Sequence, residues 1–168
     1  MDEAVVEDPV MGQRYRFERD GDVLRLGLWA EPGARVPKHF HPPLEERFHV
    51  HEGEFTFTVG RRKQRAGPGD RLAVPPGVPH AFANTGSGVA HFVAEIEPAL
   101  DMQALFEESA ALARAGMFLR PGIPAGLRGL LAAAEFADRY SHIYRQTFPP
   151  PFLVTPLARL ERRRQRRR

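Results

Sequence analysis

The first hundred residues alternate apolar and polar side chains in short runs separated by Gly, Pro and Asp. The period of two is clearest around Gly53, with Phe48 and Val50 before the glycine and Phe55 and Phe57 after it. This alternation is typical of strands with one buried face and one wetter face. The strand-like pattern extends over residues 14–97, and it is clearest in residues 23–29, 47–51, 55–59 and 89–96. Short strands with frequent turn signals predict a sandwich or barrel.

The hydrophobic pattern changes after Pro98 from a period of two to helical spacing. A first helix is expected to be capped by Asp101 and to end near Gly116, with apolar positions Met102, Leu105, Phe106, Leu112 and Ala113. A second is expected from Pro124 to the residue before the prolines at 149–151, with Leu127, Leu130, Leu131, Ala134, Tyr140 and Tyr144 roughly on one side. A short third helix is expected to start at 155–156. The predicted organisation is therefore a barrel over 1–98, a helical C-terminal extension over 99–158 packed on it, and a tail over 159–168.

The amino-acid composition limits which kinds of metal site and nucleophile the chain can have. The sequence has no cysteine, so a disulfide, a thiolate metal site and a cysteine nucleophile are excluded, and any metal must have nitrogen and oxygen ligands. The high sequence pI, about 9.8, comes largely from the tail. That segment holds seven arginines and one glutamate, a charge of +6, so the rest of the chain carries about −3 of the overall +3. We expect a solvated tail, with electrostatic attachment to nucleic acid or acidic partners as the alternative.

The beginning of the chain bears on its location. The first ten residues are acidic and lack the basic start and apolar core of a secretory signal, and no window reaches the length of a membrane span. We therefore expect a cytoplasmic protein that does not bind membranes.

Three histidines and one glutamate are candidate metal ligands. His39 and His41 are two residues apart, so both imidazoles project from one face of an extended strand. Glu46 follows two prolines that we expect to break the strand into a turn, which allows the carboxylate to come back toward the pair. The period of two then points Glu46 into the apolar interior, where a lone carboxylate is costly and a metal is the usual compensation. Imidazole and carboxylate ligands suit Fe²⁺, Zn²⁺, Mn²⁺, Ni²⁺ or Cu²⁺.

Two stretches resemble the signatures of the cupin superfamily. The first is Gly33-x5-His39-x-His41-x4-Glu46-x6-Gly53, and the second is Gly69-x5-Pro75-x-Gly77-x2-His80-x3-Asn84. The resemblance implies a mainly β fold, a cupin double-stranded β-helix or jelly-roll barrel, in which His80 joins His39, His41 and Glu46 as the fourth metal ligand. The run HFHPPLEERFHVHEGEF and the following helices are similar to small bacterial cupins with a helical C-terminal extension. Asn84 is expected to be structural, tying its turn by side-chain hydrogen bonds.

The substrate pocket is expected to be the apolar interior of the barrel. The residues expected to line it are Phe48, Val50, Phe55, Phe57 and Phe82. Three other histidines, His49, His51 and His91, are expected on the surface or in an interface. Lys38, Arg35 and Glu45 are expected to be solvated, and no side chain stands out as a catalytic acid or base.

Several functions fit such a site. Four protein ligands on a six-coordinate metal leave two positions for water, dioxygen or a chelating substrate. With Fe²⁺ this favours an oxidoreductase of the dioxygenase type acting on a small oxygen-bearing molecule. With another ion, Lewis-acid chemistry favours an isomerase or cyclase. The alternatives from other classes are a non-catalytic module that binds or senses a small molecule and a chain whose metal is structural.

The resemblance also bears on partners. It implies a homodimer formed through the sheets. His49 and His51, on an outward strand face, are candidate residues for that contact. The helices are expected to cover either the exposed sheet or the barrel mouth, and the sequence leaves both arrangements open.

Overall fold

Most of the fold is two antiparallel sheets that face each other. The computed structural model describes residues 5–147. The larger sheet has the order β1-β2-β3-β10-β5-β8, with strands Val6–Asp8, Gln13–Asp20, Val23–Ala30, Ala90–Glu97, Glu45–Glu52 and Arg71–Val74. The smaller has the order β13-β4-β9-β6-β7, with strands Arg145–Gln146, Arg35–Phe40, His80–Asn84, Phe55–Val59 and Arg62–Ala66. This is the predicted jelly-roll barrel.

The core lies between the sheets and is rich in aromatic rings. Burial alternates along β5 as the sequence predicts, with Glu46, Phe48 and Val50 buried and His51 exposed. The ring centroids of Phe48 and Phe92 are 5.2 Å apart, which joins two neighbouring strands across their inner face. Burying a side chain of this size contributes about 1.5–3 kcal/mol, so the aromatic layer is a principal source of barrel stability.

Gly53 and Asn84 stabilise turns at the ends of β5 and β9, two strands that carry candidate ligands. Gly53 has a φ of 75°, and a Cβ added there would lie 2.5 Å from the Cβ of Ala90. Any side chain at this position would therefore be both strained and overcrowded. Asn84 is structural, as expected: its Nδ2 donates to the carbonyls of Ala30 and Gly88, and its Oδ1 accepts from the backbone N–H of Gly86.

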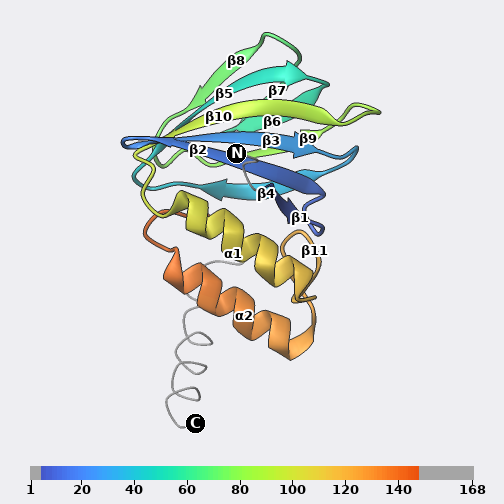
Figure 1. Cartoon of the computed structure of the whole chain (residues 1–168), viewed down its shortest axis with the longest axis vertical. Coiled ribbons are helices and arrows are strands. Elements are labelled where there is room, and N and C mark those ends of the chain that lie inside the picture. Colours follow the sequence, from blue (N-terminus) through green and yellow to red (C-terminus); the bar gives the residue numbers. More distant parts are fainter. Residues whose placement is uncertain (1–4, 148–168) are drawn as a thin grey trace.

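Two helices follow the barrel and stack on one side of it (Figure 1). They are α1, Met102–Arg114, and α2, Gly126–Arg139, and a short hairpin of β11, Phe118–Arg120, and β12, Ile123–Pro124, connects them. Within 5–147 no helix is long and apolar enough to cross a membrane. The expected third helix and the tail lie outside the described residues, so the predicted domain limits remain a prediction.

The helix prediction is confirmed in part. Asp101 occupies the N-cap position of α1 as expected, but its side chain makes no capping hydrogen bond, and its carboxylate lies 3.2 Å from Nε2 of His142. The second helix ends at Arg139, well before the prolines, because the chain turns and the backbone of β13 pairs with β4 opposite Phe40 and His39. Tyr144 therefore lies in a connecting segment beside the barrel and not on a helix.

Candidate metal centre

The four candidate ligands come from both sheets. His39 lies near the end of β4 and His41 directly after it, while His80 opens β9 and is the register partner of His39. Glu46 lies near the start of β5 in the opposite sheet. The two prolines separate β4 from β5, as the sequence predicts, so the carboxylate faces the three imidazoles across the interior.

The structure brings these four side chains together. One ligand atom from each of His39, His41, Glu46 and His80 lies within 4.8 Å of all the others, and all four residues are buried. His80 Nε2 is 2.7 Å from Glu46 Oε2, and His41 Nε2 is 3.6 Å from the same oxygen. The cluster is therefore able to hold a metal ion.

Backbone carbonyls fix the orientation of each imidazole. Nδ1 of His39 lies 2.8 Å from the carbonyl oxygen of Pro37, and Nδ1 of His80 lies 3.0 Å from that of Val78. Nδ1 of His41 lies 2.8 Å from the carbonyl oxygen of Ile143, in the segment after α2. A carbonyl only accepts, so each Nδ1 carries a proton and donates it, and in the neutral ring the lone pair is on Nε2. This is the arrangement of metal-binding histidines.

The converging atoms fit a cation. Within residues 5–147, His41 Nε2, Glu46 Oε2 and His80 Nε2 are buried and lack a hydrogen-bond partner of acceptable geometry. Unsatisfied buried polar atoms are rare and destabilising, and three around one point require an explanation. A divalent ion would satisfy them together with Nε2 of His39, because imidazole nitrogen and carboxylate oxygen suit such ions.

The pKa shifts of His39, His41 and Glu46 also favour a bound cation. Burial, with repulsion from the neighbouring imidazoles, lowers the pKa of His39, and burial lowers the pKa of His41. Burial opposes ionisation of Glu46, but the surrounding imidazoles outweigh it and lower its pKa. Burial likewise opposes charging of His80, but contact with the Glu46 carboxylate raises its pKa. At neutral pH the centre therefore offers a carboxylate and two neutral imidazoles.

A cavity of about 460 Å³ extends from the cluster between the barrel and the helices. Both helices line it, α1 with residues such as Leu105 and Phe106 and α2 with residues such as Ala133 and Phe136. Of the two locations left open by the sequence, the helices occupy the barrel mouth.

The predicted substrate-pocket residues divide into two groups. Phe48 and Phe82 line the cavity. Val50, Phe55 and Phe57 are almost fully buried and do not line it, because they lie in the layer where the two sheets meet. Alternation identifies the inward face of a strand but not which inward residues reach a cavity. A role in substrate binding stays a prediction for Phe48 and Phe82.

Three of the remaining histidines lie away from the cluster, on the outer face of the larger sheet. His49 and His51 have ring centroids 4.3 Å apart, and His91 stacks on Trp29 at 4.4 Å. The expected charged residues also point elsewhere: Lys38 donates to the carbonyl of Gly60, Glu45 pairs with Arg47, and Arg35 is exposed. The homodimer stays a prediction.

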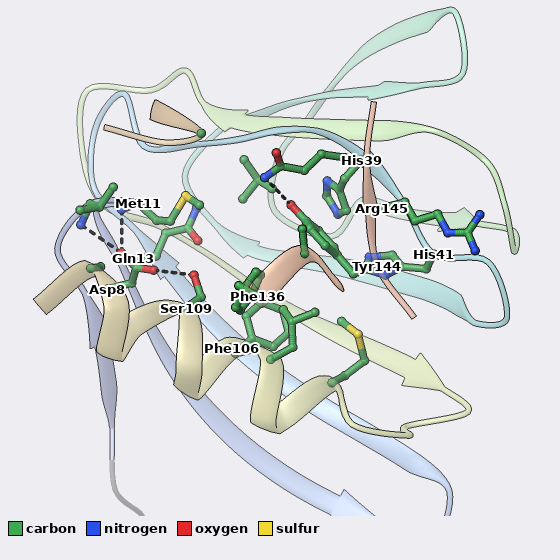
Figure 2. Close-up of a pocket in the computed structure, with 18 of the residues that line it drawn as sticks. Asp8, Met11, Gln13, His39, His41, Phe106, Ser109, Phe136, Tyr144 and Arg145 are labelled. Carbon is green, nitrogen blue, oxygen red and sulfur yellow. Dashed lines mark hydrogen bonds between the residues drawn. The ribbon is translucent and has the colours of Figure 1, made fainter. Parts of the chain in front are cut away.

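Sequence reasoning missed several polar residues of the cavity. Tyr144 has its ring centroid 5.1 Å from that of His39, and Asp8, Gln13 and Ser109 line the far end (Figure 2). Burial raises the pKa of Tyr144 to about 12, so its phenol keeps its proton at neutral pH. Their positions depend on how the helices dock on the first two strands, and the spacing of these residues in the sequence gives no signal of that docking.

Comparison with known proteins gives matches to the barrel. Residues 30–95 match the family described as cupin domain. Protein SchB of Streptomyces halstedii is 34% identical over 67 residues, which are 40% of this chain and 49% of SchB, so the chain matches about half the length of this curated relative.

Solved structures give the same fold. An RmlC-like cupin from Shewanella frigidimarina is 22% identical with a TM-score of 0.55, over 61% of this chain and 89% of that one. KdgF from Halomonas sp. is 20% identical with a TM-score of 0.54, over 60% and 92%. A predicted oxalate decarboxylase from Thermotoga maritima is 19% identical with a TM-score of 0.52, over 58% and 94%. With both signatures in place, two facing antiparallel sheets and a metal-capable cluster inside them, residues 30–95 form a cupin domain.

Proposed function

We propose that this protein is a metal-dependent enzyme that acts on a small, oxygen-bearing organic molecule, with dioxygenase chemistry as the leading reaction class. The observation that supports the proposal is the position of the His39, His41, Glu46 and His80 cluster at one end of an apolar cavity. An apolar pocket with a few convergent polar groups is the usual form of a small-molecule site. A purely structural metal would not need such a cavity beside it.

The residues of the centre have distinct roles in this proposal. The four side chains of the cluster would hold the ion, and the carbonyl groups bonded to the three Nδ1 atoms keep the imidazoles in position. When bound, a divalent ion polarises a substrate oxygen, and Fe²⁺ can in addition exchange electrons with O₂. Phe48, Phe82 and the helices exclude water from the apolar part of the substrate.

Tyr144 favours a second candidate, a non-redox isomerase or cyclase. Its hydroxyl accepts a hydrogen bond from Gln146 Nε2 at 3.2 Å, which leaves its own proton available to a substrate oxygen beside the cluster. A phenol so placed would hydrogen-bond to negative charge that develops on that oxygen, without any electron transfer. The Tyr144→Phe variant removes this donor and little else.

The test is oxygen uptake by protein purified without a metal-affinity tag and reconstituted anaerobically with Fe²⁺. Over a panel of small neutral ketones, phenols and diols, the dioxygenase proposal predicts compound-dependent uptake by the wild type and by His51→Ala, but not by His41→Ala. Uptake at equal rates in all three proteins would come from iron outside the cluster and would contradict the proposal. Product formation without uptake that falls in Tyr144→Phe would favour the non-redox reaction, and binding without any conversion would favour a sensing module.

A further inference from the structure

The cavity has a second polar end, away from the metal centre. Figure 2 shows Asp8, Met11, Gln13 and Ser109 together on one side and His39, His41 and Tyr144 on the other, with Phe106 and Phe136 between them. Asp8 and Gln13 are register partners at the junction of β1 and β2, and Ser109 projects from α1. This end is therefore formed where the helical extension docks on the first two strands.

Gln13 has an unused hydrogen-bond donor at this end. The side chain is buried, with 3% of its surface exposed, and its Oε1 accepts a hydrogen bond from the Tyr15 hydroxyl at 2.9 Å. Its Nε2 is shielded from solvent and has no hydrogen-bond partner among residues 5–147. Gln13 also lines the cavity, so the free amide donor belongs to the cavity wall.

The neighbouring carboxylate is already engaged. Asp8 Oδ1 accepts hydrogen bonds from the backbone N–H groups of Val10 and Met11, and Oδ2 accepts one from the Ser109 hydroxyl at 3.3 Å. These bonds hold Asp8 in place and occupy the Ser109 proton. A buried carboxylate at this end disfavours a ligand group that carries negative charge, because like charges repel strongly at low dielectric.

The space between the two ends is apolar. Phe106 of α1 and Phe136 of α2 lie there, and Leu26 and Leu28 of β3 line the barrel side. A ligand that fills the cavity therefore needs an uncharged, apolar middle part.

We propose that Gln13 determines specificity by donating a hydrogen bond from Nε2 to an uncharged oxygen at the far end of the ligand. The ligand class is then an elongated neutral molecule with one oxygen function that reaches the metal, an apolar body, and a second carbonyl or hydroxyl oxygen at the opposite end. This inference rests on the proposed function, because it assumes that the near end of the ligand binds the metal.

The test uses hydroxamic acids, which chelate divalent metals, as probes of the cavity. Two series, built on a benzene ring and on a biphenyl, carry a distal ethyl, acetyl or carboxylate group. The proteins are loaded with one equivalent of Zn²⁺, and binding is measured by calorimetry. The variant is Gln13→Leu, and the matched control is Gln103→Leu, since Gln103 is on α1, bonds to Glu107 and does not line the cavity.

In the wild type and in Gln103→Leu, we expect the acetyl probe of the fitting length to bind about tenfold more tightly than the ethyl probe, as one satisfied hydrogen bond predicts. The carboxylate probe should bind more weakly than the acetyl probe. In Gln13→Leu the preference for acetyl over ethyl should disappear, while Zn²⁺ content stays at one per chain.

The outcomes separate the two proposals. The role of Gln13 is refuted, and the metal site stands, in either of two cases. In the first, the wild type binds the ethyl probes but does not bind the acetyl probe more tightly in either series. In the second, Gln13→Leu still binds the acetyl probe more tightly than the ethyl probe. If the protein takes up no Zn²⁺, or if no probe of either series binds, the open metal site fails and the inference fails with it.

Discussion

Replacing His41 by Ala removes one of the four converging ligands from the barrel interior. His41 is 4% exposed, and its Nε2 lies 3.6 Å from Glu46 Oε2. The substitution also removes the hydrogen bond to the Ile143 carbonyl. Loss of a bond that merely orients a metal ligand costs about 10–100-fold in affinity, so loss of the ligand itself should cost at least about 100-fold.

This loss can be converted into a thermal shift. A metal present at 100 times its dissociation constant stabilises the folded protein by about 2.7 kcal/mol, and at a 100-fold weaker affinity the same concentration contributes only about 0.4 kcal/mol. For a chain of 168 residues this predicts a metal-induced rise in Tm of roughly 5–10 °C in the wild type and about 1 °C in His41→Ala.

The assay is thermal unfolding of each protein with and without the metal, so that any change in the metal-free Tm is subtracted. His80→Ala should behave like His41→Ala. The matched control is His51→Ala, because His51 is exposed on the outer face of the same barrel. If His51→Ala loses the metal-induced shift as fully as His41→Ala does, the assignment of inner and outer faces is refuted.

Three further predictions concern the surroundings of the centre. Phe48→Ala should lower the free energy of unfolding by about 3–5 kcal/mol in urea denaturation, since Phe48 is 3% exposed and contacts three aromatic rings. A change below about 1 kcal/mol would contradict its place in the core. Asn84→Ala should cost at least about 2 kcal/mol, because it leaves buried backbone groups unpaired, while metal content by elemental analysis stays unchanged. Below the raised pKa of His80, metal affinity should fall by about tenfold per pH unit, because binding must displace the His80 proton. Calorimetry below that pKa, in buffers of different ionisation enthalpy, should detect close to one proton released, and a pH-independent affinity would contradict this.

The sequence was most informative where a short-range pattern determines the structure. The spacing of His39, His41 and Glu46 predicts their faces, because a strand alternates every two residues and the intervening prolines force a turn. The fold and His80 required more than periodicity, and the resemblance to the cupin signatures supplied them.

What the sequence could not predict depends on long-range docking. The orientation of His41 rests on a carbonyl at Ile143, which is 102 residues away in the chain. The end of α2 at Arg139 is set by pairing of β13 with β4, and the polar end at Gln13 is completed by α1. In each case the contact that determines the structure joins the helical extension to the barrel. Such tertiary contacts outweigh local secondary-structure propensity, so the local sequence does not predict them.

The most direct test of the account is elemental analysis of protein purified without a metal-affinity tag or chelator, with His41→Ala and His51→Ala prepared in parallel. The account predicts close to one divalent transition-metal ion per chain in the wild type and in His51→Ala, and a small fraction of that in His41→Ala. Absence of metal from the wild type, even after reconstitution with Fe²⁺, Zn²⁺, Mn²⁺ or Ni²⁺, would contradict the metal centre and the functions proposed for it.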